Sequence, residues 1–312
     1  MILNPAKVAV IMYHYVRPIY ESKYPRIKGL EVHKFITQLE FLEKNFTIIN
    51  PLDFLEHVLG RNELKVPNPC LLTFDDGLKD HVQYVLPELQ KRGLSACFFV
   101  PSASSKNLEL LDVHAIHFIL ESGHSGKGLL GLAADICRKF EFDVKVPHPK
   151  SALNVLNRFD DLNVARLKRL LQYELPSAIR HKVVCELFAQ VRGDIANQLA
   201  EELYLNIADL QQMAQEGMFI GPHGHTHSWL GYQSLSDQRY EVSESVNFLR
   251  KIGVLQENWM FAYPYGSYNS ETISVLESLG CKAAFTTNVG FSSLSTERAL
   301  TFSRFDTNDY PQ

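Results

Sequence analysis

Short runs of β-branched, aromatic and small apolar residues alternate along the chain with longer stretches whose apolar residues recur at helical spacing. The runs that predict strands are residues 8–12, 71–74, 96–100, 218–221, 259–263 and 283–287. Parallel strands need a crossover between them, usually a helix, so this alternation is typical of a mostly parallel sheet covered by helices. The sequence therefore predicts an α/β fold.

The stretches between these runs have recognisable helix ends. Ser236 is expected to cap a helix that runs to about Gly253, and Asn269 or Ser270 a helix that ends near Gly280. Residues 102–205 interrupt the alternation, because they carry apolar residues at helical spacing without a clear strand. We expect one domain over residues 1–312, with a mainly helical insertion at 102–205.

Composition excludes several classes of partner. A formal net charge of -4 over 312 residues gives no electrostatic reason to expect nucleic acid. The five cysteines are scattered and never form a CxxC pair, so neither a disulfide framework nor a zinc knuckle is indicated. The sequence has no basic leader and no apolar run of membrane-spanning length, which favours the cytoplasm. The oligomeric state is not indicated.

Polar and aromatic residues gather where four of the predicted strands end. These residues are His14, the pair Asp75 and Asp76, the segment 223–227, and the segment 263–266. Active sites in strand-helix folds form at the carboxyl ends of the strands. We therefore expect these four segments to converge in space.

Two of these segments suggest a metal site. Asp75 and Asp76 in "TFDDG" are adjacent carboxylates, which repel each other unless a cation or water lies between them. The segment "HGHTH", residues 223–227, supplies three imidazoles. Histidines four apart with a carboxylate match a catalytic metal site that has three protein ligands and open positions for water. An ordinary Asp-Gly turn and a solvated histidine loop are the alternatives.

These motifs resemble those of the polysaccharide deacetylase family, the NodB homology group also called carbohydrate esterase family 4. "TFDDG" is similar to the first motif of the family, and "HGHTH" matches the two histidines of the second, H-[ST]-x-x-H. "FAYPYG", residues 261–266, is similar to the third motif, R-x-P-Y. The resemblance covers about residues 8–101 and 206–304.

The resemblance implies a distorted (β/α) barrel and a metal-dependent hydrolase that removes an N-acetyl group from an amino sugar. It implies that Asp76, His223 and His227 bind a divalent metal, zinc first, with cobalt, nickel or manganese as alternatives. Asp75 would be the catalytic base. The backbone N–H of Tyr265 would stabilise the oxyanion of the tetrahedral intermediate. The substrate would be an N-acetylated sugar in a glycan or glycan precursor.

Two departures from the family pattern affect this site. Ala262 stands where the third motif has an arginine that holds the catalytic aspartate, and we find no C-terminal L-x-H motif, whose histidine acts as the general acid. We expect His14 to replace the acid, and either Arg304 or Arg17 to replace the arginine. A histidine packed at the rim and an arginine in a surface salt bridge are the alternative interpretations.

For several other residues the sequence supports a role in the site less strongly. Tyr263, Tyr265 and Trp229 are candidates for lining the substrate site, although buried aromatic residues need no function. His225 is expected to lie beside the ligands, and His114 and His117 to pack on a helix. Two further functions stay open: a non-catalytic glycan-binding or assembly protein on the same scaffold, and an O-acetyl esterase.

Overall fold

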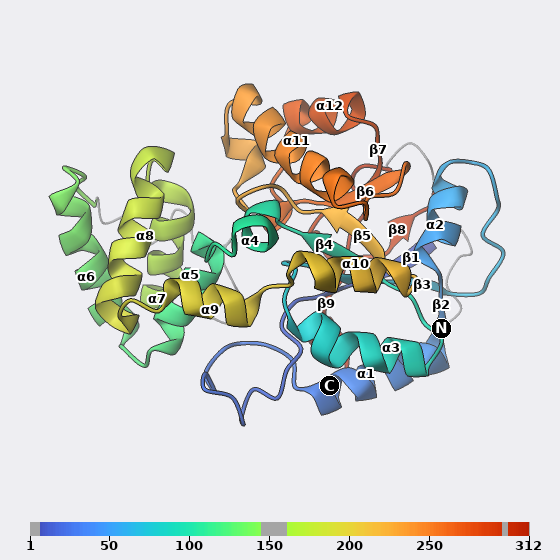
Figure 1. The fold of residues 1–312 in the computed structure, drawn as a ribbon, viewed down its shortest axis with the longest axis horizontal. Helices are drawn as coiled ribbons and strands as arrows, with labels where there is room; N and C mark the ends of the chain where they lie inside the picture. The colour runs from blue at the N-terminus through green and yellow to red at the C-terminus, as the bar shows by residue number, and fades with distance from the viewer. Residues whose placement is uncertain (1–6, 145–160, 295–298, 312) are drawn as a thin grey trace. The chain divides into compact units, whose positions relative to one another are not determined.

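The computed structural model describes residues 7–144, 161–294 and 299–311 of the chain (Figure 1). The chain folds into two compact units. The first comprises residues 1–18, 28–109 and 200–312, and the second comprises residues 19–27 and 110–199. The second unit therefore differs in its bounds from the insertion predicted at 102–205. The assignment of the whole chain to one catalytic domain stays a prediction.

The described strands of the first unit form a seven-stranded sheet and a separate strand pair. They are β1 (Lys7–Tyr13), β2 (Thr47–Ile48), β3 (Pro69–Phe74), β4 (Cys97–Val100), β5 (Phe219–Pro222), β6 (Trp259–Ala262), β7 (Cys281–Phe285), β8 (Ser292–Ser293) and β9 (Phe305–Asp306). The order in the sheet is β5-β4-β3-β1-β8, with β2 beside β3 and β9 beside β1. All pairs are parallel except β1 with β8, and β6 pairs with β7.

Helices connect these strands. They are α1 (Val32–Asn45), α2 (Pro51–Val58), α3 (Leu86–Lys91), α4 (Ser102–Asn107), α9 (Ala196–Leu203), α10 (Ile207–Gln215), α11 (Leu235–Lys251) and α12 (Ser270–Ser278). Short π and 3-10 turns add η1 (His81–Val85), η3 (Leu230–Tyr232), η4 (Pro264–Gly266) and η6 (Thr307–Asp309). Helices α11 and α12 lie beside the β6–β7 pair (Figure 1).

Side chains of β1 alternate between two buried layers, because successive residues of a strand face opposite sides of the sheet. Ala9, Ile11 and Tyr13 pack against α1, whereas Val8 and Val10 pack against α2 and the β6–β7 pair. The buried layer that contains Val8 and Val10 thus lies between the main sheet on one side and β6 and β7 on the other. This arrangement is barrel-like.

Two features bring the strand pair close to the main sheet. Gly221 of β5 lies so near β6 that an added Cβ would sit 2.7 Å from the carbonyl oxygen of Met260, so this contact requires a glycine. After β7, Phe302 N donates to Ala284 O, and β9 then pairs with β1. Among the described strands, the hydrogen-bonded ladder is interrupted between β5 and β6.

The predicted alternation is confirmed, since all six predicted strands are present with ends shifted by at most two residues. The capping prediction at the start of α11 is wrong by two positions, because Ser234 rather than Ser236 accepts a hydrogen bond from the backbone N–H of Asp237. Asn269 caps α12 as expected. The two-residue strands β2, β8 and β9 were not predicted, because so short a run carries no readable alternation.

The second unit is helical in its described part. It contains α5 (Asp112–Glu121), α6 (Gly126–Lys139), α7 (Leu162–Arg169), η2 (Leu170–Glu174) and α8 (Ser177–Arg192). Helix α5 packs against α8, and α6 packs against α7. Arg192 of α8 forms an ion pair with the buried Glu121 and donates from Nε to the carbonyl oxygen of Phe118. None of the helices described in the chain combines the length and apolar composition of a membrane crossing.

Candidate active site

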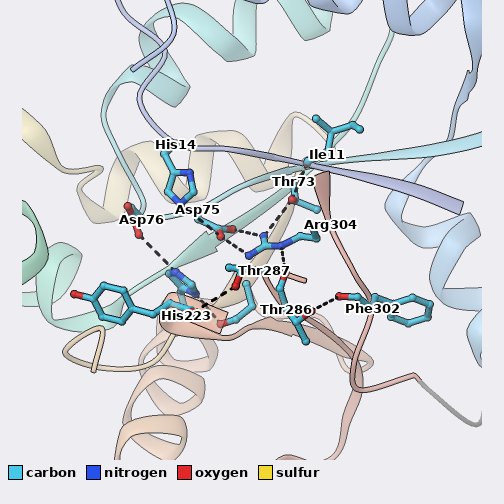
Figure 2. Close-up of polar contacts among 12 residues, drawn as sticks. Ile11, His14, Thr73, Asp75, Asp76, His223, Thr286, Thr287, Phe302 and Arg304 are labelled. Atoms are coloured by element: carbon cyan, nitrogen blue, oxygen red, sulfur yellow. Dashed lines mark hydrogen bonds and ion pairs between the residues drawn. The ribbon is translucent and has the colours of Figure 1, made fainter. Parts of the chain in front are cut away.

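Three of the four strand ends that were expected to converge belong to one parallel sheet: His14 follows β1, Asp75 and Asp76 follow β3, and His223 follows β5. The fourth, residues 263–266, follows β6 of the separate strand pair. Parallel strands of one sheet place their carboxyl ends at the same edge, so these side chains meet there (Figure 2). The backbone N–H of Asp75 donates to the carbonyl oxygen of Tyr13, 2.9 Å away, which ties the end of β3 to β1.

Asp76, His223 and His227 form a buried group able to hold a metal ion. One ligand atom from each lies within 4.8 Å of the others. Asp76 Oδ1 is 3.5 Å from Nε2 of His223 and 3.2 Å from Nε2 of His227. Nδ1 of His223 donates to the carbonyl oxygen of Ala262 at 2.7 Å, which leaves Nε2 with its lone pair toward Asp76. Two imidazole nitrogens and a carboxylate suit a divalent transition metal.

The backbone at two of these ligands takes an unusual conformation. Asp76 has φ 76° and His227 has φ 59°, in the left-handed region that residues with a side chain seldom adopt. Such strain costs on the order of 1–3 kcal/mol per residue and persists where the surrounding structure fixes it, often at functional sites. Asp76 and His227 therefore depend on the surrounding structure for their orientation.

A buried glutamate on α11 holds the histidine loop. Oε2 of Glu241 accepts hydrogen bonds from the backbone N–H groups of His225 and Thr226, each at 2.8 Å. Its Oε1 accepts from the hydroxyl of Thr226 at 2.6 Å. In addition, the backbone N–H of Ser102 donates to the carbonyl oxygen of Gly224 at 3.1 Å. The loop that carries both histidine ligands is thus fixed by backbone contacts.

Arg304 forms a bidentate ion pair with Asp75 in the interior of the protein. Nη1 lies 2.9 Å from Oδ1 and Nη2 lies 2.7 Å from Oδ2, and both side chains are buried (Figure 2). Nε donates to the carbonyl oxygen of Thr286, and Nη1 is 3.3 Å from Oγ1 of Thr73. The forked guanidinium is well suited to this task because it can satisfy a carboxylate and a carbonyl together.

The ion pair sets the charge of Asp75. Burial alone would raise the pKa of this carboxyl group, but the pKa is lowered, first by the charge and hydrogen bonds of Arg304 and further by the imidazoles of His223 and His14. Asp75 is therefore ionised at neutral pH and keeps the lone pairs that a proton acceptor needs.

Arg17, the other candidate for the missing cation, is bound elsewhere. Its Nε and Nη2 each lie 2.7 Å from the carboxylate of Asp80, which also accepts from the backbone N–H of Val16. The structure thus brings Arg304, and not Arg17, to Asp75.

His14 lies at the edge of the site. Its Nε2 is 4.0 Å from Oδ2 of Asp75, and 38% of its side chain is exposed. The carbonyl oxygen of His14 is 3.1 Å from Nε2 of the buried His81. His14 is thus anchored by its backbone while its ring reaches solvent, which is the position that a group exchanging protons with a bound molecule requires.

The aromatic candidates divide between the site and the core. Tyr265 has φ 57°, and its ring packs edge-on against His227 and stacks on Trp229, each with centroids 4.6 Å apart. Tyr263 is fully buried and donates its hydroxyl proton to the carbonyl oxygen of Leu300. The prediction that Tyr263 lines the substrate site is therefore wrong, because the end of β6 turns this ring toward α12.

The remaining histidines stay outside the ligand group. Nδ1 of His225 is 2.8 Å from the hydroxyl oxygen of Ser102. His114 and His117 pack against each other on α5, in the second unit. The prediction missed Glu241. A signal was available, because this charged residue falls on the apolar stripe of α11 between Gln238 and Val242, where a solvated glutamate would not be placed.

The fold is α/β, and the chain is similar in sequence and in fold to polysaccharide deacetylases. The model of the family described as Polysaccharide deacetylase matches residues 191–284. That stretch includes His223, His227 and Ala262, whereas Asp75 and Arg304 lie outside it. The Bacillus subtilis protein YxkH, provisionally described as a polysaccharide deacetylase, is 27% identical over 99 residues. That match covers 32% of this chain and 35% of YxkH, so the chain spans about a third of the length of this curated relative.

Solved structures resemble the chain over nearly its whole length. The Streptococcus pyogenes deacetylase PplD, solved in complex with acetate, gives a TM-score of 0.60 at 18% identity, over 97% of this chain and 93% of PplD. The BpsB deacetylase domain from Bordetella bronchiseptica gives 0.55 at 16% identity, over 97% of this chain and 96% of that domain. The predicted α/β fold and the resemblance to polysaccharide deacetylases are confirmed.

Proposed function

We propose that the protein is a metal-dependent hydrolase that removes the N-acetyl group from an N-acetylated amino sugar in a glycan or glycan precursor. The observation that carries the proposal is the pairing of two groups at one sheet edge. Asp76, His223 and His227 form a buried ligand set, and the neighbouring Asp75 is kept ionised by Arg304. Together they supply the ligands and the base that hydrolysis of an amide needs.

The ligand set would hold a divalent metal ion, zinc first, which when bound supplies Lewis-acid polarisation of a carbonyl oxygen and acidifies water. Asp75 takes a proton from the attacking water while the water oxygen forms a bond to the carbonyl carbon. Arg304 keeps the carboxylate oriented throughout this transfer. The backbone N–H of Tyr265 donates to the oxyanion that develops. The bond between carbon and nitrogen then breaks, which releases acetate and a free amine.

His14 delivers the proton that the leaving amine requires. The 4.0 Å between its Nε2 and the carboxylate of Asp75 allows a bound acetamide to be reached by both groups. Trp229, stacked on Tyr265, presents an aromatic surface beside the ligands that suits the apolar face of a sugar ring. The cytoplasmic location stays a prediction.

The proposal is tested by measuring acetate and free amine released from N-acetylated and O-acetylated amino-sugar oligomers. The protein is assayed as purified, after treatment with a chelator, and after zinc is restored. We expect equal amounts of acetate and amine from the N-acetylated oligomers, loss of both after chelation, and recovery with zinc. Acetate from the O-acetylated oligomers alone would favour the esterase alternative. Protein that binds these oligomers without metal and without acetate release would be a glycan-binding protein instead.

A further inference from the structure

A second cluster of reactive side chains lies in the helical unit, apart from the residues described above. Cys185 and His181 are one turn apart on α8, and Asp112 begins α5. Sγ of Cys185 is 3.4 Å from Nε2 of His181, and Nδ1 of His181 is 2.8 Å from Oδ1 of Asp112. Sγ is also 3.8 Å from Nδ1 of His181, so the sulfur lies beside the ring. A nucleophile, an imidazole and a carboxylate that orients the imidazole are thus in contact, contributed by two helices.

The carboxylate fixes the state of the imidazole. The hydrogen bond that Asp112 accepts from His181 is the main cause that raises the pKa of His181, to about 10. The ring is therefore a cation at neutral pH that donates its Nδ1 proton to Asp112, and the sulfur of Cys185 lies beside this charged ring. A histidine cation beside a thiol stabilises the thiolate, which is the nucleophilic form of cysteine.

The other charged residues around Cys185 do not cancel the positive charge of His181. Lys182 is three positions away on α8, so it belongs to the same helix face. Glu186 follows Cys185 in the chain, but its carboxylate is 3.0 Å from Nζ of Lys139 on α6. The negative charge of Glu186 is thus offset by a lysine of its own.

Cys185 differs from the other four cysteines of the chain. Cys185 is exposed, whereas Cys70, Cys97, Cys137 and Cys281 are buried. Burial raises the pKa of each buried thiol and keeps it protonated. Buried thiols are also closed to reagents in solution, so the chain offers one thiol that is accessible and has a cation beside it.

We propose that Cys185 is a thiol modification site that forms mixed disulfides with small disulfides. The thiol proton leaves to solvent, and the thiolate attacks one sulfur of the disulfide. A bond forms between that sulfur and Sγ, the original bond between the two sulfurs breaks, and the other half departs as a thiolate. His181 and Asp112 act as positioning residues, because they hold a positive charge at the sulfur. The inference is independent of the deacetylase proposal, since it uses none of the residues of that site.

The test is the rate at which the folded protein reacts with an aromatic disulfide that releases a coloured thiolate, with mass spectrometry to locate the adduct. We expect the first adduct on Cys185 and no fast reaction in Cys185→Ser. His181→Gln removes the cation, and we expect the rate at neutral pH to fall at least about threefold, because each tenfold loss of thiolate is partly offset by higher nucleophilicity. Asp112→Asn is also expected to slow the reaction.

His124→Gln is the matched control, because His124 is a histidine of the same unit whose Nδ1 contacts Ser122 and no cysteine. We expect its rate to equal that of the unchanged protein. Local unfolding of α8 in His181→Gln would speed the reaction by exposing thiols, so a slower rate separates the charge effect from damage to the helix. An equal or faster rate in His181→Gln, or a first adduct on any other cysteine, would overturn the proposal.

Discussion

At the scale of single residues, the pair of Asp75 and Arg304 is the main departure from the motifs that the chain resembles. The arginine of the third motif is replaced by Ala262, and a guanidinium reaches the same aspartate from 229 residues away in the sequence. Ala262 still contributes through its backbone, because its carbonyl oxygen accepts from Nδ1 of His223. The contact with Asp75 thus comes from an arginine outside the third motif, and Ala262 orients a histidine instead.

Arg304→Met is expected to leave Asp75 as a buried charge without a partner. Breaking a buried pair in this way costs about 3–5 kcal/mol of unfolding free energy. We expect the milder change Arg304→Lys to keep the positive charge but to lose the bidentate contact with Asp75. Acetate release should fall by about tenfold or more, with bound metal unchanged. Urea unfolding and acetate release measure the two effects.

Arg61→Lys provides the control, since Arg61 forms an ion pair with Glu56 in which both side chains are exposed. We expect this change to alter neither measurement appreciably. Full stability of Arg304→Met together with full turnover would show that Asp75 does not depend on Arg304.

At the scale of elements, helix α11 positions the loop that carries both histidine ligands. Glu241 accepts three hydrogen bonds from this loop, two of them from backbone N–H groups. His227 has a left-handed backbone conformation that the loop must maintain. The geometry of the ligand set therefore depends on a helix that contributes no ligand.

Glu241→Ala is expected to weaken zinc binding by about 10–100-fold, the range found when groups that orient metal ligands are removed. Competition with a coloured chelator measures the affinity. Glu244→Ala is the matched control, because Glu244 lies one turn along α11 and pairs with the exposed Lys106. Glu241→Gln, which retains an acceptor, should give an intermediate affinity. Equal zinc affinity in all three variants would contradict this role of α11.

The elements themselves could be predicted from sequence because their signals are local. Apolar runs marked the six longer strands, and Asn269 marked the start of α12. Tyr263 was assigned wrongly, because the side of a strand end that faces the core depends on what packs there. Glu241 was missed because its partners, the backbone N–H groups of His225 and Thr226, follow β5, and only the tertiary fold brings α11 to them.

At the scale of the whole molecule, the site exists because the fold brings together strand ends that are distant in sequence. The meeting of His14, Asp75, Asp76 and His223 could be predicted in outline, because each follows a strand that the sequence marks and parallel strands end at one edge of a sheet. The choice between Arg304 and Arg17 could not be made from sequence. It depends on the path of residues 299–306 beside β7 and β1, which is set by long-range hydrogen bonds such as that from Thr286 N to Phe302 O.

Buried His81 makes the stability of the molecule depend on pH. Its ring packs against Phe74 and Phe98, and burial is the main cause that lowers its pKa from 6.5 to about 4. Between these two values the unfolded chain binds a proton that the folded chain does not, so stability is lost as pH falls from about 6.5 to about 4. The titration of His81 alone changes the free energy of unfolding by up to about 1.4 kcal/mol per pH unit in this range.

His81→Gln removes that titration while keeping a donor for the carbonyl oxygen of His14. We expect the variant to be less stable at neutral pH and to show a shallower loss of stability on acidification, measured by urea unfolding across the same range. His33→Gln, at an exposed histidine of α1, should keep the slope of the unchanged protein. Identical slopes in His81→Gln and the unchanged protein would rule out His81 as the cause.

The central claim is that Asp76, His223 and His227 hold a metal ion while the adjacent Asp75 acts as the base. It is tested most directly by measuring bound metal and acetate release together in Asp75→Asn and His223→Ala. We predict that Asp75→Asn keeps about one divalent ion per chain and loses turnover by roughly 100- to 10,000-fold, the usual contribution of a general base. His223→Ala should lose both metal and turnover. Full turnover in Asp75→Asn, or undiminished metal in His223→Ala, would contradict the account.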